Sequence, residues 1–146
     1  MFSKNFYEQL KRDEGFYSTP YWDIRHYSWG YGTRAPQSWN WWNTPRITKA
    51  QASEELMEYC KIVEKELIQI FGDKLKKISQ VRIDCLGNML YNLGLTNFSS
   101  FRNMISEIKS ENINWPAVAF HAYDSRWYGQ VGNRSKRIVR EIAYGK

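Results

Sequence analysis

The sequence has few of the residues that build metal sites and disulfide frameworks. It contains two cysteines and two histidines among its 146 residues. Cys60 and Cys85 lie far apart and no histidine stands beside either of them, which is not the spacing of a zinc site or a redox pair. We therefore expect two buried thiols, and we expect the protein to need neither a metal nor another cofactor.

Long apolar runs are missing as well. No segment approaches the roughly 20 apolar residues of a membrane-spanning helix. The first residues, 1–5, do not combine a charged stretch with an apolar one, so no signal peptide is recognisable. These absences predict a protein that is made soluble in the cytoplasm and is not stably inserted in a membrane.

Aromatic and basic residues, in contrast, are abundant. Phe, Trp and Tyr make up 16% of the chain, and the formal net charge is +6. Aromatic side chains beyond the needs of a core suggest a surface that stacks on flat ligands such as sugars or bases, and the charge favours an anionic partner. The basic residues are dispersed and form no recognised nucleic-acid motif, so we do not expect a nucleic-acid partner.

Apolar residues recur at helical spacing through most of the chain. Helices are predicted over residues 3–13, 48–71, 79–93 and 99–109, from Asn114 onward, and from Arg134 to about Ala143, with Asn133 as its cap. Thr48 and Gln51 form a capping box at the start of the longest one. Residues 16–33 carry Tyr, Trp, Thr and Ser, interrupted by proline and glycine, which predicts short strands and turns.

The segment from Arg34 to Arg46 is an irregular loop that carries Trp39, Trp41 and Trp42. Two interpretations stay open at this point. The three rings either form a hydrophobic plug that closes a small lobe, or they stack on sugar rings. The residue pattern alone does not decide between them.

The order of these segments predicts an α+β fold in a single domain. A small N-terminal lobe with a short antiparallel sheet would span about residues 14–47. A linking helix would span about 48–71, and a larger all-helical lobe, about 72–146, would also receive the first helix, 3–13.

Two acidic residues are the first candidates for chemistry. Glu14 ends the first predicted helix, where the helix dipole disfavours a negative charge and tends to raise its pKa. Asp23 follows in the aromatic hairpin. Glycoside hydrolysis needs such a pair, one carboxyl to protonate the leaving oxygen and another to activate water or attack carbon. Taken alone, two acids at this spacing are more often solvated surface charges.

Two blocks of sequence resemble the phage-type lysozymes. The first consists of Glu14-Gly15, Tyr21-Trp22-Asp23 and Ser28-Trp29-Gly30-Tyr31-Gly32. The second consists of Asn88 to Gly94, Phe101-Arg102-Asn103 and Ser125 to Arg137, in the order found in the C-terminal lobe of that family. The similarity runs from about residue 6 to about residue 140 and is weakest between 34 and 80.

The resemblance implies a lysozyme-like fold and an endolysin that hydrolyses the β-1,4 bond between N-acetylmuramic acid and N-acetylglucosamine in bacterial peptidoglycan. It implies a monomer that resides in the host cytoplasm before lysis and reaches the cell wall through a membrane lesion. The alternative is a catalytically impaired protein of the same fold that binds peptidoglycan or serves as a structural component.

By the same resemblance, Glu14 is the general acid, Asp23 activates the water, and Ser28 helps to hold that water. Arg134 would form a supporting ion pair with Glu14. Four further positions align with family residues that contact saccharide: Tyr91, Arg34, Met104 and His121. Without the resemblance, a histidine such as His121 would be read as a residue of an exposed helix surface.

The sequence departs from the family pattern near the candidate site. The turn after Asp23, from Ile24 to Tyr27, is one residue shorter and lacks the family's glycine, and Ser28 stands where the family has threonine. Serine keeps the hydroxyl but not the methyl group that restricts its rotamer, so the water would be held less firmly. Thr33 stands where the family often has histidine, so any ion pair of that histidine would be absent or relocated. We interpret His26 as an exposed turn residue, not as a base.

Overall fold

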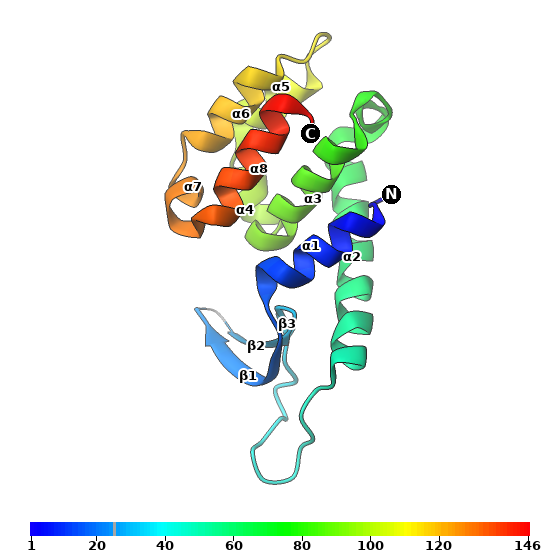
Figure 1. The fold of residues 1–146 in the computed structure, drawn as a ribbon, viewed down its shortest axis with the longest axis vertical. Coiled ribbons are helices and arrows are strands. Elements are labelled where there is room, and N and C mark those ends of the chain that lie inside the picture. Colours follow the sequence, from blue (N-terminus) through cyan, green and yellow to red (C-terminus); the bar gives the residue numbers. More distant parts are fainter. Residues whose placement is uncertain (25) are drawn as a thin grey trace. The chain divides into compact units, whose positions relative to one another are not determined.

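The computed structural model describes residues 1–24 and 26–146 (Figure 1). The first half of the chain forms helix α1 (Lys4–Glu14), strands β1 (Tyr17–Asp23), β2 (His26–Gly30) and β3 (Thr33–Arg34), and helix α2 (Lys49–Phe71). A 3₁₀ helix (Gly72–Lys77) then precedes α3 (Gln80–Leu93), α4 (Leu95–Ser99), α5 (Arg102–Lys109), α6 (Trp115–Tyr123), α7 (Arg126–Val131) and α8 (Asn133–Tyr144). The class is α+β, as predicted.

The chain divides into two compact units. The sheet unit is Tyr7–Ile62, and the helical unit is Met1–Phe6 together with Val63–Lys146. The boundaries fall inside α1 and α2, so each of these helices contributes residues to both units. The lobe boundaries expected from the sequence stay predictions.

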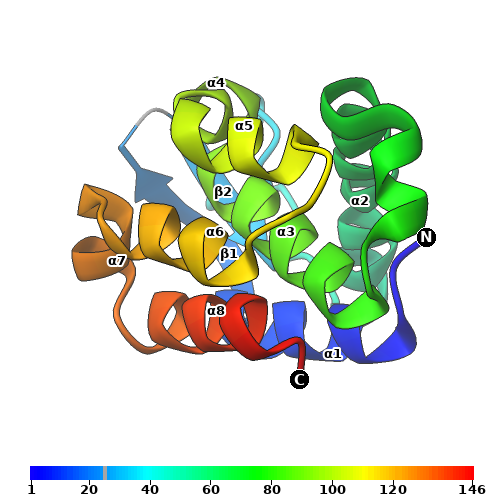
Figure 2. The same ribbon diagram turned by 90° about the horizontal axis from the view of Figure 1, so that it is seen from above.

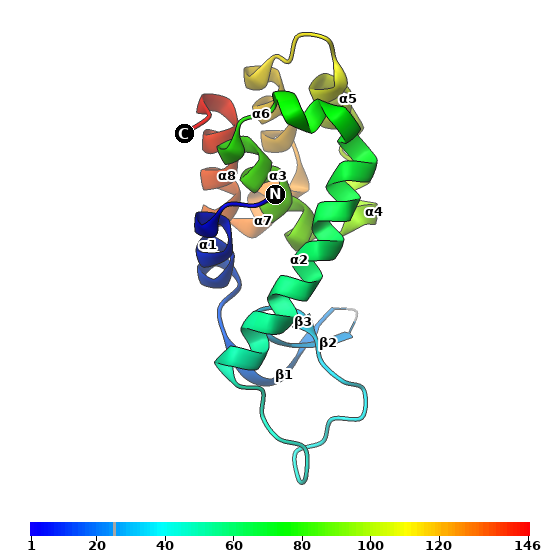
Figure 3. The ribbon, with the colours of Figure 1, turned by 90° about the vertical axis from the view of Figure 1, so that its right-hand side faces the viewer.

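The sheet unit contains a three-stranded antiparallel sheet in the order β1-β2-β3 (Figure 3). In the first hairpin Tyr21 pairs with Ser28. The register shifts between Tyr17 and Tyr21, and this stretch contains Pro20, which has no N–H to contribute to a ladder. The strands and turns predicted for residues 16–33 are confirmed.

The start of α2 is set by the predicted capping box. The amide of Thr48 donates to Oε1 of Gln51 at 3.0 Å, and the amide of Gln51 donates to Oγ1 of Thr48 at 3.1 Å. The first turn of a helix leaves its N–H groups without backbone partners, and the bond from Gln51 to Thr48 satisfies one of them. The reciprocal bond satisfies the N–H group of Thr48, the cap residue. The helix therefore begins where these two residues can bond each other.

Glu55 ties the first half of α2 to the sheet. Its Oε1 accepts hydrogen bonds from Nε1 of Trp29 at 3.0 Å and from Oγ1 of Thr33 at 2.7 Å. Thr33 is the position at which the family often has histidine. The carboxylate of Glu55 is thus held by a hydroxyl and an indole N–H at this place, which keeps the β2–β3 connection fixed against the helix.

In the helical unit, α8 packs against both α3 and α6, and α5 packs against α6 (Figure 2). Its core is made of fully buried apolar side chains, which include Leu86, Met89, Leu90, Phe98, Ile108, Ile138 and Ile142. The start of α6 is as predicted, because Oδ1 of Asn114 accepts from the amide of Ala117 at 3.1 Å and Pro116 lies in the first turn.

Several details of the helical half differ from the sequence-based expectation. The predicted helix over 99–109 begins only at Arg102, after the separate helix α4 has ended. Asn133 is the first residue of α8 and not its cap, since Gly132 holds the cap position with φ 80°. Helix α7 lies in a stretch with no predicted helix. A helix as short as α7, with 6 residues, shows too little of the 3.6-residue period to be recognised.

Both cysteines are buried, as predicted. Burial raises the pKa of the Cys60 thiol to about 12. Burial also raises the pKa of Cys85, together with the neighbouring carboxylate of Glu141, which accepts a hydrogen bond from Sγ of Cys85 at 3.2 Å. Neither thiol forms an appreciable amount of thiolate near neutral pH, so neither is a nucleophile.

No helix within residues 1–24 and 26–146 is both long enough and apolar enough to cross a membrane. The same described part of the chain contains no group of three or more His, Cys, Asp or Glu side chains arranged to hold a metal ion.

Candidate active site

Glu14 is the last residue of α1. The chain leaves this helix through Gly15, whose φ of 71° lies in the left-handed region and whose amide donates to the carbonyl of Lys11 at 2.9 Å. This is the helix stop that the sequence predicts. The half-buried side chain of Glu14 extends to the turn between β2 and β3, where its carboxyl lies against Gly32.

The contact with Glu14 requires glycine at position 32. A Cβ atom on Gly32 would lie 2.9 Å from Oε2 of Glu14 and 3.3 Å from its Cδ, and the backbone has φ +87°. Both the crowding and the left-handed conformation disfavour any other residue. The missing side chain at this position is what leaves room for the carboxyl beside the sheet.

Replacing Gly32 with alanine is expected to lower the peptidoglycan hydrolysis that the resemblance implies roughly a hundredfold, because the new methyl group displaces the Glu14 carboxyl. Gly72→Ala is the matched control, since Gly72 has φ +54° and nothing within 4 Å of the position of its Cβ. Both variants should lose about 1–2 kcal/mol of stability to the backbone conformation, whereas only the first should lose activity. Clearing of permeabilised cells and thermal unfolding measure the two effects. Equal activity in both variants would contradict the contact.

Four polar side chains share one face of the β1–β2 hairpin. Tyr21 pairs with Ser28 and Asp23 with His26, and residues two apart on a strand point to the same side. Ser28 is fully buried. Its Oγ donates to Oδ2 of Asp23 at 3.3 Å and lies 3.4 Å from Nδ1 of His26. Because Asp23 is itself exposed, solvent reaches this carboxyl while Ser28 holds it from the buried side.

The phenol of Tyr21, on this same face, is influenced by the charges of both Asp23 and Glu14. Burial raises the pKa of Tyr21 to about 12, assisted by the negative charges of Asp23 and Glu14, while a hydrogen bond with Ser28 acts in the opposite direction. The phenol therefore keeps its proton through neutral and moderately alkaline pH and stays able to donate a hydrogen bond. Sequence reasoning did not single out Tyr21 for a role of its own, although its spacing of two residues from Asp23 places both on one side of a strand.

The prediction that His26 is an exposed turn residue is wrong. His26 begins strand β2, is half-buried, and has its Nδ1 at 3.2 Å from the carbonyl oxygen of Tyr27 in addition to its proximity to Ser28. The reason is the register of the hairpin. Asp23 already pairs with His26, so the turn is shorter than the four residues that the sequence suggests.

Ile24 lies in the left-handed region in this turn, with φ 56°. A β-branched residue there costs about 1–2 kcal/mol, which is consistent with the glycine that the family has in this turn and this chain lacks. Arg25, the next residue in the sequence, lies outside the described residues.

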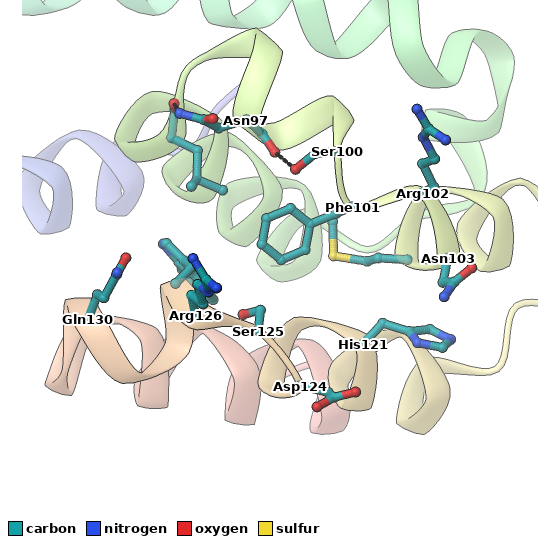
Figure 4. A pocket seen from close by; sticks show the side chains of 13 residues that line it. Asn97, Ser100, Phe101, Arg102, Asn103, His121, Asp124, Ser125, Arg126 and Gln130 are labelled. Carbon is teal, nitrogen blue, oxygen red and sulfur yellow. Dashed lines mark hydrogen bonds between the residues drawn. The ribbon is translucent and has the colours of Figure 1, made fainter. Parts of the chain in front are cut away.

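The predicted saccharide contacts lie in different parts of the chain. Arg34 of β3 is exposed and lines a groove beside the Trp-rich loop. Met104 of α5 and His121 of α6 line one pocket of the helical unit (Figure 4). Tyr91 of α3 is only 7% exposed and is not among the described residues that line that pocket.

The pocket of the helical unit has a volume of about 510 Å³, within the usual range for small-molecule sites. Asn103 and His121 lie near one end of it, and Arg126 and Gln130 toward the other (Figure 4). Met104 is fully buried, so it forms part of the wall with little surface to offer. The polar residues of α7 in this pocket, Arg126 and Gln130, were missed by sequence reasoning, because only the fold brings them opposite α5.

Arg134 lies in the first turn of α8. Its Nε donates to Oδ1 of the buried Asn88 on α3 at 2.8 Å. The sequence did not identify this partner, since the two residues are far apart in the chain. The predicted ion pair of Arg134 with Glu14 would join residues of the two units and stays a prediction.

These features favour a glycoside hydrolase: an α+β protein with one carboxyl at a helix end, a second on a hairpin, and a hydroxyl bonded to the second. The family model for phage lysozyme matches residues 11–140 of the 146, so the chain belongs to the phage lysozyme family. No match is found among the curated proteins. The fold is thus lysozyme-like, and the chain is, in general terms, a lysozyme- or endolysin-type peptidoglycan hydrolase associated with phage lysis.

Proposed function

We propose that the protein is an endolysin that hydrolyses the β-1,4 glycosidic bond between N-acetylmuramic acid and N-acetylglucosamine in bacterial peptidoglycan. Beyond family membership, the observation that supports this most directly is that the Glu14 carboxyl lies against Gly32 in the turn after β2, while Asp23 accepts a hydrogen bond from Ser28 of that same strand. Two carboxyls in one neighbourhood are what paired acid and base catalysis of glycoside hydrolysis requires.

In this proposal Glu14 is the general acid. It donates its proton to the glycosidic oxygen as the bond from that oxygen to C1 breaks. A water molecule forms the new bond to C1 from the opposite side of the sugar and gives a proton to Asp23. The proton on Asp23 then passes to solvent and Glu14 takes up another, so one water is consumed and both carboxyls are restored.

Ser28 acts in this scheme as a positioning residue. Its hydroxyl is buried and donates to Asp23, so it orients the carboxylate and, through it, the attacking water. A base held in one orientation reacts more efficiently than one free to rotate. Arg34, Met104, His121 and Tyr91 remain proposed saccharide contacts.

We favour inversion at C1. Inverting enzymes hold their carboxyls roughly 6.5–9.5 Å apart to admit a water, whereas about 5–5.5 Å is typical of retaining enzymes that form a covalent intermediate. The first-formed anomer, observed by NMR during hydrolysis of a soluble peptidoglycan fragment, should be α. A β anomer would require Asp23 to act as a nucleophile.

Reducing-end analysis of digested peptidoglycan tests the bond that is cleaved. Borohydride reduction of the products should label N-acetylmuramic acid at the new ends. Labelled N-acetylglucosamine would assign cleavage to the other glycosidic bond, and a 1,6-anhydro sugar would show that no water is consumed. The alternative function, a catalytically impaired peptidoglycan-binding or structural protein of the same fold, predicts no new ends and no clearing of permeabilised cells.

An endolysin made in the cytoplasm must also reach the cell wall. The protein would act as a monomer and pass from the host cytoplasm to the cell wall through a membrane lesion.

A further inference from the structure

A second groove lies beside the β1–β2 hairpin and the loop that follows β3. Trp22 and Tyr27 are cross-strand partners, and their rings pack edge to face with centroids 5.3 Å apart. They are each one residue from Asp23 or Ser28, so they point to the other side of the sheet. With residues of the loop after β3 they line a groove of about 510 Å³, which we call the aromatic groove.

The loop that forms the far wall of the aromatic groove is organised around Asn40. Oδ1 of Asn40 accepts hydrogen bonds from the backbone amides of Trp42 at 3.2 Å and Asn43 at 3.1 Å. The backbone amide of Asn40 donates to Oγ1 of Thr44 at 3.1 Å. Such side-chain bonds to the backbone hold a turn in one conformation. The groove wall is therefore preorganised, which reduces the entropy lost on binding.

Two indole rings of the loop are fixed relative to each other. Nε1 of Trp39 donates to the carbonyl of Pro45 at 3.1 Å, and the rings of Trp39 and Trp41 meet edge to face with centroids 4.8 Å apart. Both line the groove. Their orientation is thus set before any ligand is present.

The aromatic residues of this region are largely exposed. Trp22 is 60% exposed, Trp41 67% and Trp42 95%. The hydrophobic plug considered from the sequence is therefore wrong for Trp41 and Trp42. A contiguous group of exposed rings is costly in water and marks a binding surface. Trp22 and Trp41 line the groove, whereas Trp42 does not.

Polar side chains stand between the rings of the groove. Arg34, Gln37, Asn40 and His26 line it together with the aromatic residues, and no Asp or Glu is among the described lining residues. The arrangement offers flat apolar surfaces with hydrogen-bond donors at their edges. A pyranose ring matches it, because one face presents C–H groups to an indole while the hydroxyl and amide groups at its rim bond polar side chains.

We propose that the aromatic groove is an additional glycan-binding site that takes N-acetylated pyranose rings of a peptidoglycan strand. The identity of the glycan rests on the proposed function. The groove shares His26 with the face that carries Asp23 and shares Arg34 with the proposed saccharide contacts. Its rings Trp39 and Trp41 belong to neither set, so they hold the protein on the insoluble wall and do not take part in bond cleavage. A membrane surface fits less well, because a loop that inserts into lipid needs apolar tips facing outward, whereas Trp39 and Trp41 face a groove with polar side chains.

Binding to purified sacculi and to the soluble tetramer of N-acetylglucosamine tests the proposal. Full-length Glu14→Gln protein is the parent, so that no substrate is digested. Adding Trp41→Ala should weaken binding of both probes roughly tenfold, the loss expected for one stacked ring. Adding Trp42→Ala, in the same loop but outside the groove, should leave binding unchanged. Trp41→Phe keeps a ring and should retain most of the affinity. Both side chains are largely exposed, so truncation leaves no cavity, and thermal unfolding checks the fold of each variant.

Equal affinity of the parent and the Trp41→Ala variant for both probes would overturn the proposal. Equal losses from Trp41→Ala and Trp42→Ala would also overturn it, because the loop would then act as a general apolar surface. Vesicles of equimolar phosphatidylethanolamine and phosphatidylglycerol form a further arm, and binding to them that requires both tryptophans, without sugar binding, would assign the loop to the membrane. Failure of the proposed function is a separate result, since the wild-type protein would then release no reducing ends.

Discussion

Replacing Glu14 with glutamine is expected to abolish clearing of permeabilised cells, with hydrolysis slowed by at least about a hundredfold. The amide has the shape of the carboxyl but no acidic proton to give to the leaving oxygen. It also keeps the contact with Gly32, where the carboxyl lies against the turn. The thermal unfolding midpoint should therefore stay close to that of the wild type while activity is lost.

Glu8→Gln is the matched control for this variant. Glu8 lies on the same helix, α1, and is exposed, so its replacement removes one negative charge from α1 without touching the site. Activity equal to wild type is expected. A fully active Glu14→Gln variant, or an equal loss in the two variants, would remove Glu14 from the role of general acid.

Replacing Asp23 with asparagine should also slow hydrolysis by at least about a hundredfold, because the amide cannot take a proton from the attacking water. Ser28 can still donate to the amide oxygen, as it does to Oδ2 of Asp23 at 3.3 Å, so the hairpin should stay folded. Asp73→Asn is the control, since the side chain of Asp73 is 96% exposed and belongs to the helical unit.

A substrate whose leaving group departs without protonation distinguishes the role of Glu14 from that of Asp23. An activated aryl glycoside needs no general acid, so it should restore much of the rate to the Glu14→Gln variant. It should not restore the Asp23→Asn variant, because the attacking water still lacks a base. Equal rescue of both variants would show that Asp23 does not activate the water.

Features that depend on neighbouring residues were predictable from the sequence. The capping box at Thr48 begins α2, Asn114 caps α6, and Gly15 ends α1 beside Glu14. Strand residues two apart share a face, so the side on which Asp23 lies could be worked out from the alternation. Such features could be predicted because their hydrogen bonds and dihedral angles involve residues only a few positions apart.

The errors of prediction arise where the register or short length of an element decides the outcome. His26 was placed on a turn because the sequence does not show that Asp23 pairs with it. Helix α7 went unrecognised because 6 residues do not show a helical period. In both cases the pairing or packing partner, and not the local residues, selects the conformation.

The sequence by itself therefore determined the α+β class, the main helix starts, the two candidate carboxyls and the hydroxyl of Ser28, since local propensity and a family resemblance carry this information. Only the tertiary structure brought Glu14 against Gly32, related Tyr21 to both carboxyls, and left Trp41 exposed beside a groove. These facts depend on contacts between segments that are distant in the chain. Which distant segments meet is decided by the burial of apolar surface and the fit of side chains across the whole unit, and no local pattern records that outcome.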